Sequence, residues 1–186
     1  MKRLFIGIPV QSASTVIATE NWQNDRKLCN NLISWTNPGN WHITLFFLGD
    51  TAISQITLLQ HLIDVSFDET KSFGTELNGV GVFPDTGKPR IFWIGLKDLH
   101  SLLPAREMLG DLLRQNGFTF DNKPLKPHLT LGRIKFLKDR QAFEKLLKDY
   151  GKFRFDNVSI DRIVLYESIL TQQGPVYKPL FVKRLS

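Results

Sequence analysis

Two short stretches of the chain carry the same pattern: Trp41-His42-Ile43-Thr44-Leu45 and Pro127-His128-Leu129-Thr130-Leu131. In each, a histidine is followed by an apolar residue, a threonine and a leucine. Both stretches begin runs that are rich in β-branched and apolar residues, which favours strands. Alternate residues of a strand face the same side. The histidine and the threonine of each stretch are therefore expected to share one face of a strand.

Hydrolysis of a phosphodiester is the chemistry that suits two such pairs. An imidazole with a pKa of about 6.5 serves as acid or base close to neutral pH. One histidine would take a proton from the attacking water while the other gives one to the leaving oxygen. The threonine hydroxyls would donate hydrogen bonds to the non-bridging oxygens, where negative charge builds up. A 2′,3′-cyclic phosphate is a fitting substrate, because its ring holds the leaving oxygen in place.

A histidine two residues before a threonine also arises by chance on a half-buried strand. Two copies among four histidines, with a shared leucine and a shared strand context, disfavour that explanation. The remaining histidines lie in no such motif: His61 is within a helical stretch, and His100 is next to the start of another. We interpret both as structural or solvated.

Length and composition indicate a single globular domain over residues 1–186. The chain is long enough for one core and short for two independent domains, with 42% hydrophobic and 23% charged residues. No stretch is long and apolar enough to span a bilayer, so we expect no membrane partner. The sequence shows no interface signature, and we expect a monomer. The lone Cys29 and the short apolar run at Met1–Pro9 favour the cytoplasm over export. A net charge of +6 attracts polyanions such as RNA.

Hydrophobic periodicity predicts a mixed α+β fold, because several neighbouring strands have no helix between them. Expected helices start at Ser12 or Ser14 and run toward Asn30, and cover 54–65, 99–113 and 139–150. Residues 79–89 are expected to form a loop. Strands are expected over 3–10, 32–35, 41–48, 71–78, 90–96, 128–136, 158–166 and 176–185.

At the two histidine motifs the sequence resembles the two-histidine (2H) phosphoesterase superfamily. Within it, the sequence resembles the RNA 2′,3′-cyclic phosphodiesterases, also called the 2′-5′ RNA ligase family. The resemblance covers nearly the whole chain. The segments that carry it are residues 3–8, 40–50, 79–84, 89–95, 126–133, 164–168 and 174–177.

The resemblance implies two pseudo-symmetric lobes, each an antiparallel β-sheet backed by helices, with the site in a central cleft. It also implies hydrolysis of an RNA-terminal 2′,3′-cyclic phosphate to a 2′-phosphate without a metal or other cofactor, with reversible 2′-5′ RNA ligation as a related activity. By the same resemblance His42 is the proton donor and His128 the proton acceptor, with Thr44 and Thr130 beside them. The residues alone leave the two histidine roles open, because the motifs are nearly symmetric.

Two further residues are candidates for substrate binding. Strict alternation places Arg133 opposite His128, so only a bulge or the end of the strand near Gly132 would bring its guanidinium to phosphate or base. The alternative is a surface arginine. Phe46 shares the face of His42 by alternation and would stack on a base. For Phe46, the alternative is packing in the core.

Other functions remain open on the sequence. A metal hydrolase fits poorly, because the chain has no HExxH motif and no cysteine cluster. A phosphodiesterase for small cyclic nucleotides would keep the same mechanism. A non-catalytic RNA-binding module would explain the basic charge, but it would not need two groups that titrate near neutrality.

Overall fold

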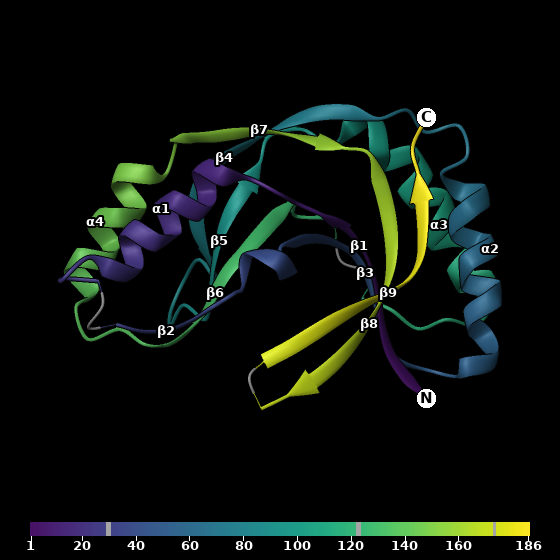
Figure 1. Cartoon of the computed structure of the whole chain (residues 1–186), viewed down its shortest axis with the longest axis horizontal. Coiled ribbons are helices and arrows are strands. Elements are labelled where there is room, and N and C mark those ends of the chain that lie inside the picture. Colours follow the sequence, from purple (N-terminus) through teal and green to yellow (C-terminus); the bar gives the residue numbers. More distant parts are fainter. Residues whose placement is uncertain (29–30, 122–123, 173) are drawn as a thin grey trace.

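The computed structural model describes residues 1–28, 31–121, 124–172 and 174–186, so the lone Cys29 lies outside the described part. Within it the chain forms two antiparallel sheets with helices packed against each (Figure 1). The predicted α+β class and the two-lobed arrangement are confirmed.

The first sheet, which we call sheet A, has the strand order β3-β1-β8-β9. Two helices lie beside it, at the right of Figure 1. Helix α3 packs on α2, and α2 in turn contacts β9. The elements of this lobe are β1 (Lys2–Pro9), β3 (His42–Thr51), β8 (Arg162–Thr171), β9 (Gly174–Arg184), α2 (Ile56–Ser66) and α3 (Leu103–Gln115).

The second sheet, sheet B, has the strand order β2-β6-β5-β4-β7. Its helices α1 and α4 contact β7 and β4 and lie at the left of Figure 1. The elements of this lobe are α1 (Ala13–Asn24), β2 (Leu32–Trp35), β4 (Phe73–Phe83), β5 (Ile91–Leu96), β6 (His128–Phe136), α4 (Arg140–Tyr150) and β7 (Arg154–Ile160).

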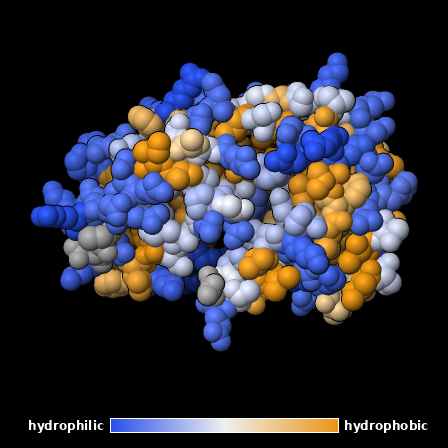
Figure 2. All heavy atoms as spheres, viewed as in Figure 1, coloured by the Kyte–Doolittle hydropathy of each residue, from blue (hydrophilic) through white to orange (hydrophobic). Residues whose placement is uncertain are grey.

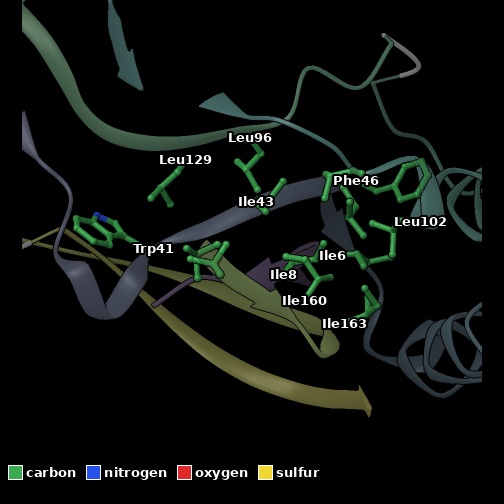
Figure 3. Packing of buried hydrophobic residues seen from close by; sticks show 14 of the residues in the cluster. Ile6, Ile8, Trp41, Ile43, Phe46, Leu96, Leu102, Leu129, Ile160 and Ile163 are labelled. Atoms are coloured by element: carbon green, nitrogen blue, oxygen red, sulfur yellow. The ribbon is translucent and has the colours of Figure 1, made fainter. Parts of the chain in front are cut away.

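The buried apolar side chains of both sheets form one continuous core. Figure 3 shows Ile43 of β3 and Leu129 of β6 among these residues. Their exposed fractions are 1% and 0%. Each directly follows a histidine, so alternation turns His42 and His128 away from the core, onto what we call the site face of each sheet.

Helix α1 confirms one predicted boundary and corrects the other. The Ser12 side chain caps its start by accepting a hydrogen bond from the Thr15 amide at 3.1 Å. The helix ends at Asn24 and does not continue toward Asn30. The Asp25 carboxylate accepts the amides of Lys27 and Leu28, and this local turn replaces helical hydrogen bonds.

Two predicted strand boundaries were wrong. Strand β4 continues to Phe83 through the expected loop, because Gly79 adopts a φ of 67° at a register shift and the following residues pair with β5. The expected strand over 158–166 is two strands. It breaks at Asp161, where the chain leaves sheet B as β7 and enters sheet A as β8.

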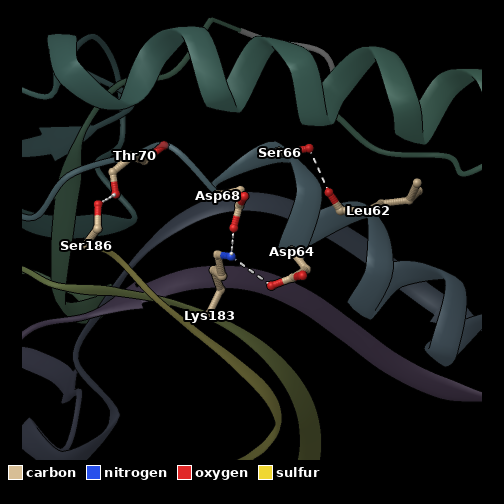
Figure 4. A network of polar contacts seen from close by, with 7 residues as sticks. All are labelled: Leu62, Asp64, Ser66, Asp68, Thr70, Lys183 and Ser186. Carbon is tan, nitrogen blue, oxygen red and sulfur yellow. Dashed lines mark hydrogen bonds and ion pairs between the residues drawn. The ribbon is translucent and has the colours of Figure 1, made fainter.

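A polar network fastens α2 to the last strand (Figure 4). The Lys183 ammonium donates to Asp64 and to Asp68, each at 2.8 Å. Nearby, the Ser186 amide donates to the Thr70 carbonyl at 3.2 Å. These contacts fix the chain end against the segment that follows α2.

Among the described residues, no helix has the length and apolar character needed to cross a membrane. On the face seen in Figure 2, hydrophobic residues are interspersed with hydrophilic ones.

Candidate active site

The two histidine motifs come together where the sheets meet. Strands β3 and β6 contact each other although they belong to different sheets. The histidines are close enough for the charge of His128 to lower the pKa of His42. Across the same junction, burial raises the pKa of the Tyr177 hydroxyl of β9. Arg133 is close enough for its positive charge to oppose this rise. The site faces of sheets A and B therefore look toward one another.

Both histidines are held in the same way. His42 Nδ1 lies 2.7 Å from the Asn40 carbonyl oxygen, and His128 Nδ1 lies 2.7 Å from the Lys126 carbonyl oxygen. A carbonyl only accepts, so Nδ1 carries the proton in each ring. This contact fixes the tautomer and leaves both Nε2 atoms for a substrate.

Aromatic rings surround His42. The ring centroid of Phe5 is 4.7 Å from that of His42, and the ring of Tyr177 meets it edge-on at 5.0 Å. Tyr166 stacks on Phe5 at 5.0 Å. Burial among these rings lowers the pKa of His42, and this effect outweighs the hydrogen bond to the Asn40 carbonyl, which raises it.

We expect His42 to titrate below the ordinary histidine pKa of 6.5. The unfolded chain then takes up this proton first as the pH falls. His42 therefore destabilises the fold as the pH falls below about 6.5 and has no such effect well above it. In a Tyr177→Ala variant the pKa should rise, because water reaches the ring. NMR titration of the His42 ring protons measures both values. A wild-type midpoint at or above 6.5, or one that the variant leaves unchanged, would contradict this account.

The hairpin of β8 and β9 is tied to the His42 motif. The Asn40 side-chain amide donates to the Pro175 carbonyl at 2.8 Å, while the Asn40 backbone carbonyl accepts from His42. Asn40 thus links the hairpin that carries Tyr177 to the segment that orients His42. The sequence reasoning did not identify this residue.

Around His128, aromatic side chains of sheet B line the site. The ring of Phe83 meets His128 edge-on at 5.0 Å, and Trp93 lies 5.1 Å from Phe83. The Trp93 indole lies across Gly81, where an added Cβ would come within 2.2 Å of the ring. A residue without a side chain at this position leaves room for the indole, whose ring centroid lies 6.5 Å from that of His128 at an interplanar angle of 62°.

A bulge carries Arg133 onto the site face. Trp93 pairs with Thr130 and Ile91 pairs with Arg133, with a register shift between Phe92 and Trp93. Ile91 and Trp93 share a face of β5, so their partners Thr130 and Arg133 share a face of β6. The bulge that the sequence reasoning required for Arg133 is therefore present, and the guanidinium side chain is exposed.

The same bulge occurs in β3 and brings Phe47 onto the site face. Thr44 pairs with Gly7 and Phe47 pairs with Phe5, across a register shift in β3. Since Gly7 and Phe5 share a face of β1, Thr44 and Phe47 share a face of β3. Phe47 is 42% exposed, and the Arg3 guanidinium carbon lies 5.0 Å from its ring centroid.

The site role expected for Phe46 does not fit its position. Phe46 is 3% exposed and packs edge-on against Phe120 at 5.0 Å, while Arg106 of α3 covers its ring at 4.7 Å. Figure 3 shows it beside Leu102, on the helix side of the sheet. The bulge reverses the alternation after Thr44, so the core-packing alternative holds for Phe46.

Within the described residues, the structure holds no group of three or more His, Cys, Asp and Glu side chains that could bind a metal ion.

A two-lobed α+β fold with one histidine–threonine pair on each facing sheet defines the class of two-histidine phosphoesterases. The family model described as LigT-like phosphoesterase matches residues 16–93 and 97–177. The chain belongs to this family, which confirms the resemblance seen in its motifs.

Several relatives bear the name RNA 2′,3′-cyclic phosphodiesterase. The protein from Thermotoga maritima is 35% identical over 148 residues, which cover 80% of this chain and 77% of the relative. The protein from Aeropyrum pernix is 35% identical over 144 residues, which cover 76% of this chain and 80% of the relative.

Solved structures share the fold. The TT0787 protein of Thermus thermophilus has a TM-score of 0.80 at 25% identity, with 98% of this chain and 97% of that chain covered. Escherichia coli LigT in its apo form has a TM-score of 0.73 at 20% identity, with 100% and 98% covered. A structure of the same LigT complexed with 3′-AMP has a TM-score of 0.71 at 20% identity, with the same coverage.

Proposed function

We propose that this protein hydrolyses the 2′,3′-cyclic phosphate at an RNA end to a 2′-phosphomonoester, by acid–base catalysis with His42 and His128. The matched anchoring of the two imidazoles through Nδ1, on facing sheets, carries this proposal, since it leaves both Nε2 atoms available to one substrate. The names of the relatives from Thermotoga maritima and Aeropyrum pernix support the same substrate.

In this mechanism water attacks phosphorus in line with the bond to the ribose 3′-oxygen. His128 takes the proton of the water at its Nε2, and His42, in its imidazolium form with Nδ1 held by the Asn40 carbonyl, gives its Nε2 proton to the 3′-oxygen as the ring opens. The hydroxyls of Thr44 and Thr130 donate to the non-bridging oxygens, and Arg133 adds a positive charge. Acid, base and charge stabilisation are all supplied by side chains, so the proposed reaction uses no metal ion and no cofactor.

Phe47 is the residue that we assign to the nucleobase, in place of Phe46. It is exposed, lies on the face of Thr44, and has the Arg3 guanidinium over its ring. A base can stack on an exposed aromatic ring whatever its identity, which suits an enzyme that acts on RNA ends. The complex of LigT with 3′-AMP supports a nucleotide ligand for this fold.

Two adjacent phenylalanines provide a matched test of this assignment. A Phe47→Ala variant should raise KM for a cyclic-phosphate substrate about tenfold with little change in Tm, because it removes only a stacking surface. A Phe46→Ala variant should instead lower Tm markedly, because it opens a cavity in the core. Steady-state kinetics and thermal unfolding of both variants measure this. A raised KM in Phe46→Ala together with a lowered Tm in Phe47→Ala would contradict the assignment of Phe47, and not Phe46, to the site face.

The preference for RNA, the oligomeric state and the cellular location are parts of the same proposal. The net charge of +6 favours polyanionic RNA over a small nucleotide with a single negative charge, and it raises the rate at which RNA meets the protein. We propose a monomer over residues 1–186 that acts in the cytoplasm without a membrane partner. A small cyclic nucleotide would fit the same histidines, and 2′-5′ ligation would be the reverse of cleavage at the same site.

Turnover assays on two substrates test the function. The wild-type protein, with excess chelator, is given an oligoribonucleotide ending in a 2′,3′-cyclic phosphate and, separately, 2′,3′-cyclic AMP. We expect turnover of both, with the higher kcat/KM for the oligonucleotide. Turnover of the small nucleotide alone would replace the RNA substrate by a nucleotide. Binding of RNA without turnover of either substrate would favour the non-catalytic binding module.

A further inference from the structure

An exposed apolar pair lies at the far end of the strand that begins with His128. Leu32 of β2 and Phe136 of β6 are each 57% exposed, and they pair with each other across the two strands. Within the described part of the chain, no aromatic ring and no cation packs on Phe136, so its ring is open to a ligand. Exposed apolar residues that stand together are more informative than single ones, because they mark interaction sites.

A bulge turns this pair onto the site face of sheet B. Ile33 pairs with Ile134 and Leu32 pairs with Phe136, so Lys135 is an extra residue in β6. Ile134 is buried in the core, and Ile33 opposite it packs against the same core. Leu32 follows Ile33 and therefore faces the other side. Its partner Phe136 lies beside it on that side, as directly opposite residues of an antiparallel pair do.

Arg133 connects the pair to the catalytic face. It pairs with Ser34, which is two residues from Leu32 in β2 and so shares its face. Arg133 and Phe136 are three residues apart, roughly 10 Å along a strand. Stacked nucleotides rise about 3.4 Å each along one strand. An RNA whose cyclic phosphate is held at Arg133 and His128 therefore reaches Phe136 within a few nucleotides.

The charge around the pair favours RNA over a protein partner. Four cations stand within residues 133–140, and all are exposed: Arg133, Lys135, Lys138 and Arg140. The one acid in this range, Asp139, caps the start of α4. An open aromatic ring among several cations suits a single-stranded nucleic acid, whose bases stack on the ring while its phosphates meet the cations.

We propose that Phe136, with Leu32 beside it, stacks a nucleobase upstream of the cyclic phosphate, and that Lys135 contacts a neighbouring phosphate of the same RNA. This inference rests on the proposed function, because the reaction at His42 and His128 places the RNA end. The contact selects an RNA strand over a free cyclic nucleotide, which is too short to reach the end of β6.

Two substrates separate this site from the catalytic one. kcat/KM is measured for an oligoribonucleotide of about eight nucleotides that ends in a 2′,3′-cyclic phosphate, and for 2′,3′-cyclic AMP. In Phe136→Ala, kcat/KM for the oligonucleotide should fall about tenfold, the effect of losing one stacked base. kcat/KM for 2′,3′-cyclic AMP should not change. Phe136→Tyr keeps an aromatic ring and should keep both values.

Equilibrium binding of the 2′-phosphate product of the same RNA gives a second readout. Phe136→Ala should weaken this binding about tenfold. Lys135→Ala should lower the slope of log K against log salt concentration by about 0.7, the share of one phosphate contact with a single strand. A wild type that turned over neither substrate would overturn the proposed function, and this binding measurement would still decide the role of Phe136.

An exposed phenylalanine outside the site serves as the matched control. Phe153 is 49% exposed and precedes β7, so Phe153→Ala should change neither turnover nor binding. Unchanged RNA turnover and binding in Phe136→Ala would overturn the inference, as would an equal loss of kcat/KM on both substrates. Hydrolysis would stand in the first case. A wild-type dimer that Phe136→Ala converts to a monomer, with RNA binding unchanged, would assign the pair to contact between two copies instead.

Discussion

Replacing His42 or His128 with alanine is expected to lower kcat/KM for a cyclic-phosphate RNA end by about 10³-fold or more. Each imidazole moves a proton in the transition state, and a positioned acid or base contributes roughly 10²–10⁴-fold. Both rings are half-buried, and among the described residues the hydrogen bond of each ring is the one through Nδ1, so their removal should leave the fold intact. Initial rates for each variant, with circular dichroism as a check on folding, measure this.

His61 provides the control for this experiment. It is exposed on α2, away from the motifs, and His61→Ala should keep wild-type turnover. Near-normal activity in both His42→Ala and His128→Ala would contradict the two-histidine mechanism. Loss in only one of them would mean that water or another group replaces the second proton carrier.

Replacing Thr44 or Thr130 with valine is expected to lower kcat by about 10²-fold, with a smaller change in KM. Valine keeps the shape and the β-branching, so the substitution removes one hydroxyl and little else. A donor directed at developing negative charge is worth roughly 10²–10³-fold in kcat. The steady-state constants of each variant distinguish this role from simple binding, because a contact made equally in the ground state changes KM alone.

Thr57 offers a matched substitution outside the site. It is exposed on α2, so Thr57→Val should change neither constant. A threonine variant of the site that altered only KM would assign its hydroxyl to substrate binding. Full activity in both site variants would exclude the threonines from the mechanism.

The sequence predicted which face each histidine–threonine pair occupies, because local alternation decides it. Ile43 and Leu129 must be buried, so the neighbouring histidines and threonines must face outward. Strand β6 begins at His128 and ends at Phe136, as the pattern indicated. The family also followed from these motifs, since short matching segments in a fixed order are more specific than any one of them.

The bulges could not be predicted from one strand alone. Alternation assigned Phe46 to the site face, and one extra residue in β3 reverses that assignment in favour of Phe47. Comparing the two motifs would have revealed this, because Phe47 follows His42 at the same interval as Arg133 follows His128. A bulge that brings one residue to the site predicts the same for the other.

Contacts between segments that are far apart in the chain could not be predicted from the sequence either. Tyr177, Phe83 and Asn40 reach the histidines through pairings between strands that are far apart in the chain. The break at Asp161 likewise reflects a change of sheet, which the hydrophobic pattern of a single segment does not encode. Local periodicity fixes which face is buried, and only the assembled sheets decide which faces meet.

The most direct measurement is a single-turnover reaction in ¹⁸O-labelled water, with an RNA that ends in a 2′,3′-cyclic phosphate. The account predicts a 2′-phosphate product with one labelled oxygen on phosphorus, formed at the same rate with excess chelator and about 10³-fold more slowly in His128→Ala. A 3′-phosphate product, or turnover that the chelator abolishes, would contradict water attack between His42 and His128 with release of the 3′-oxygen.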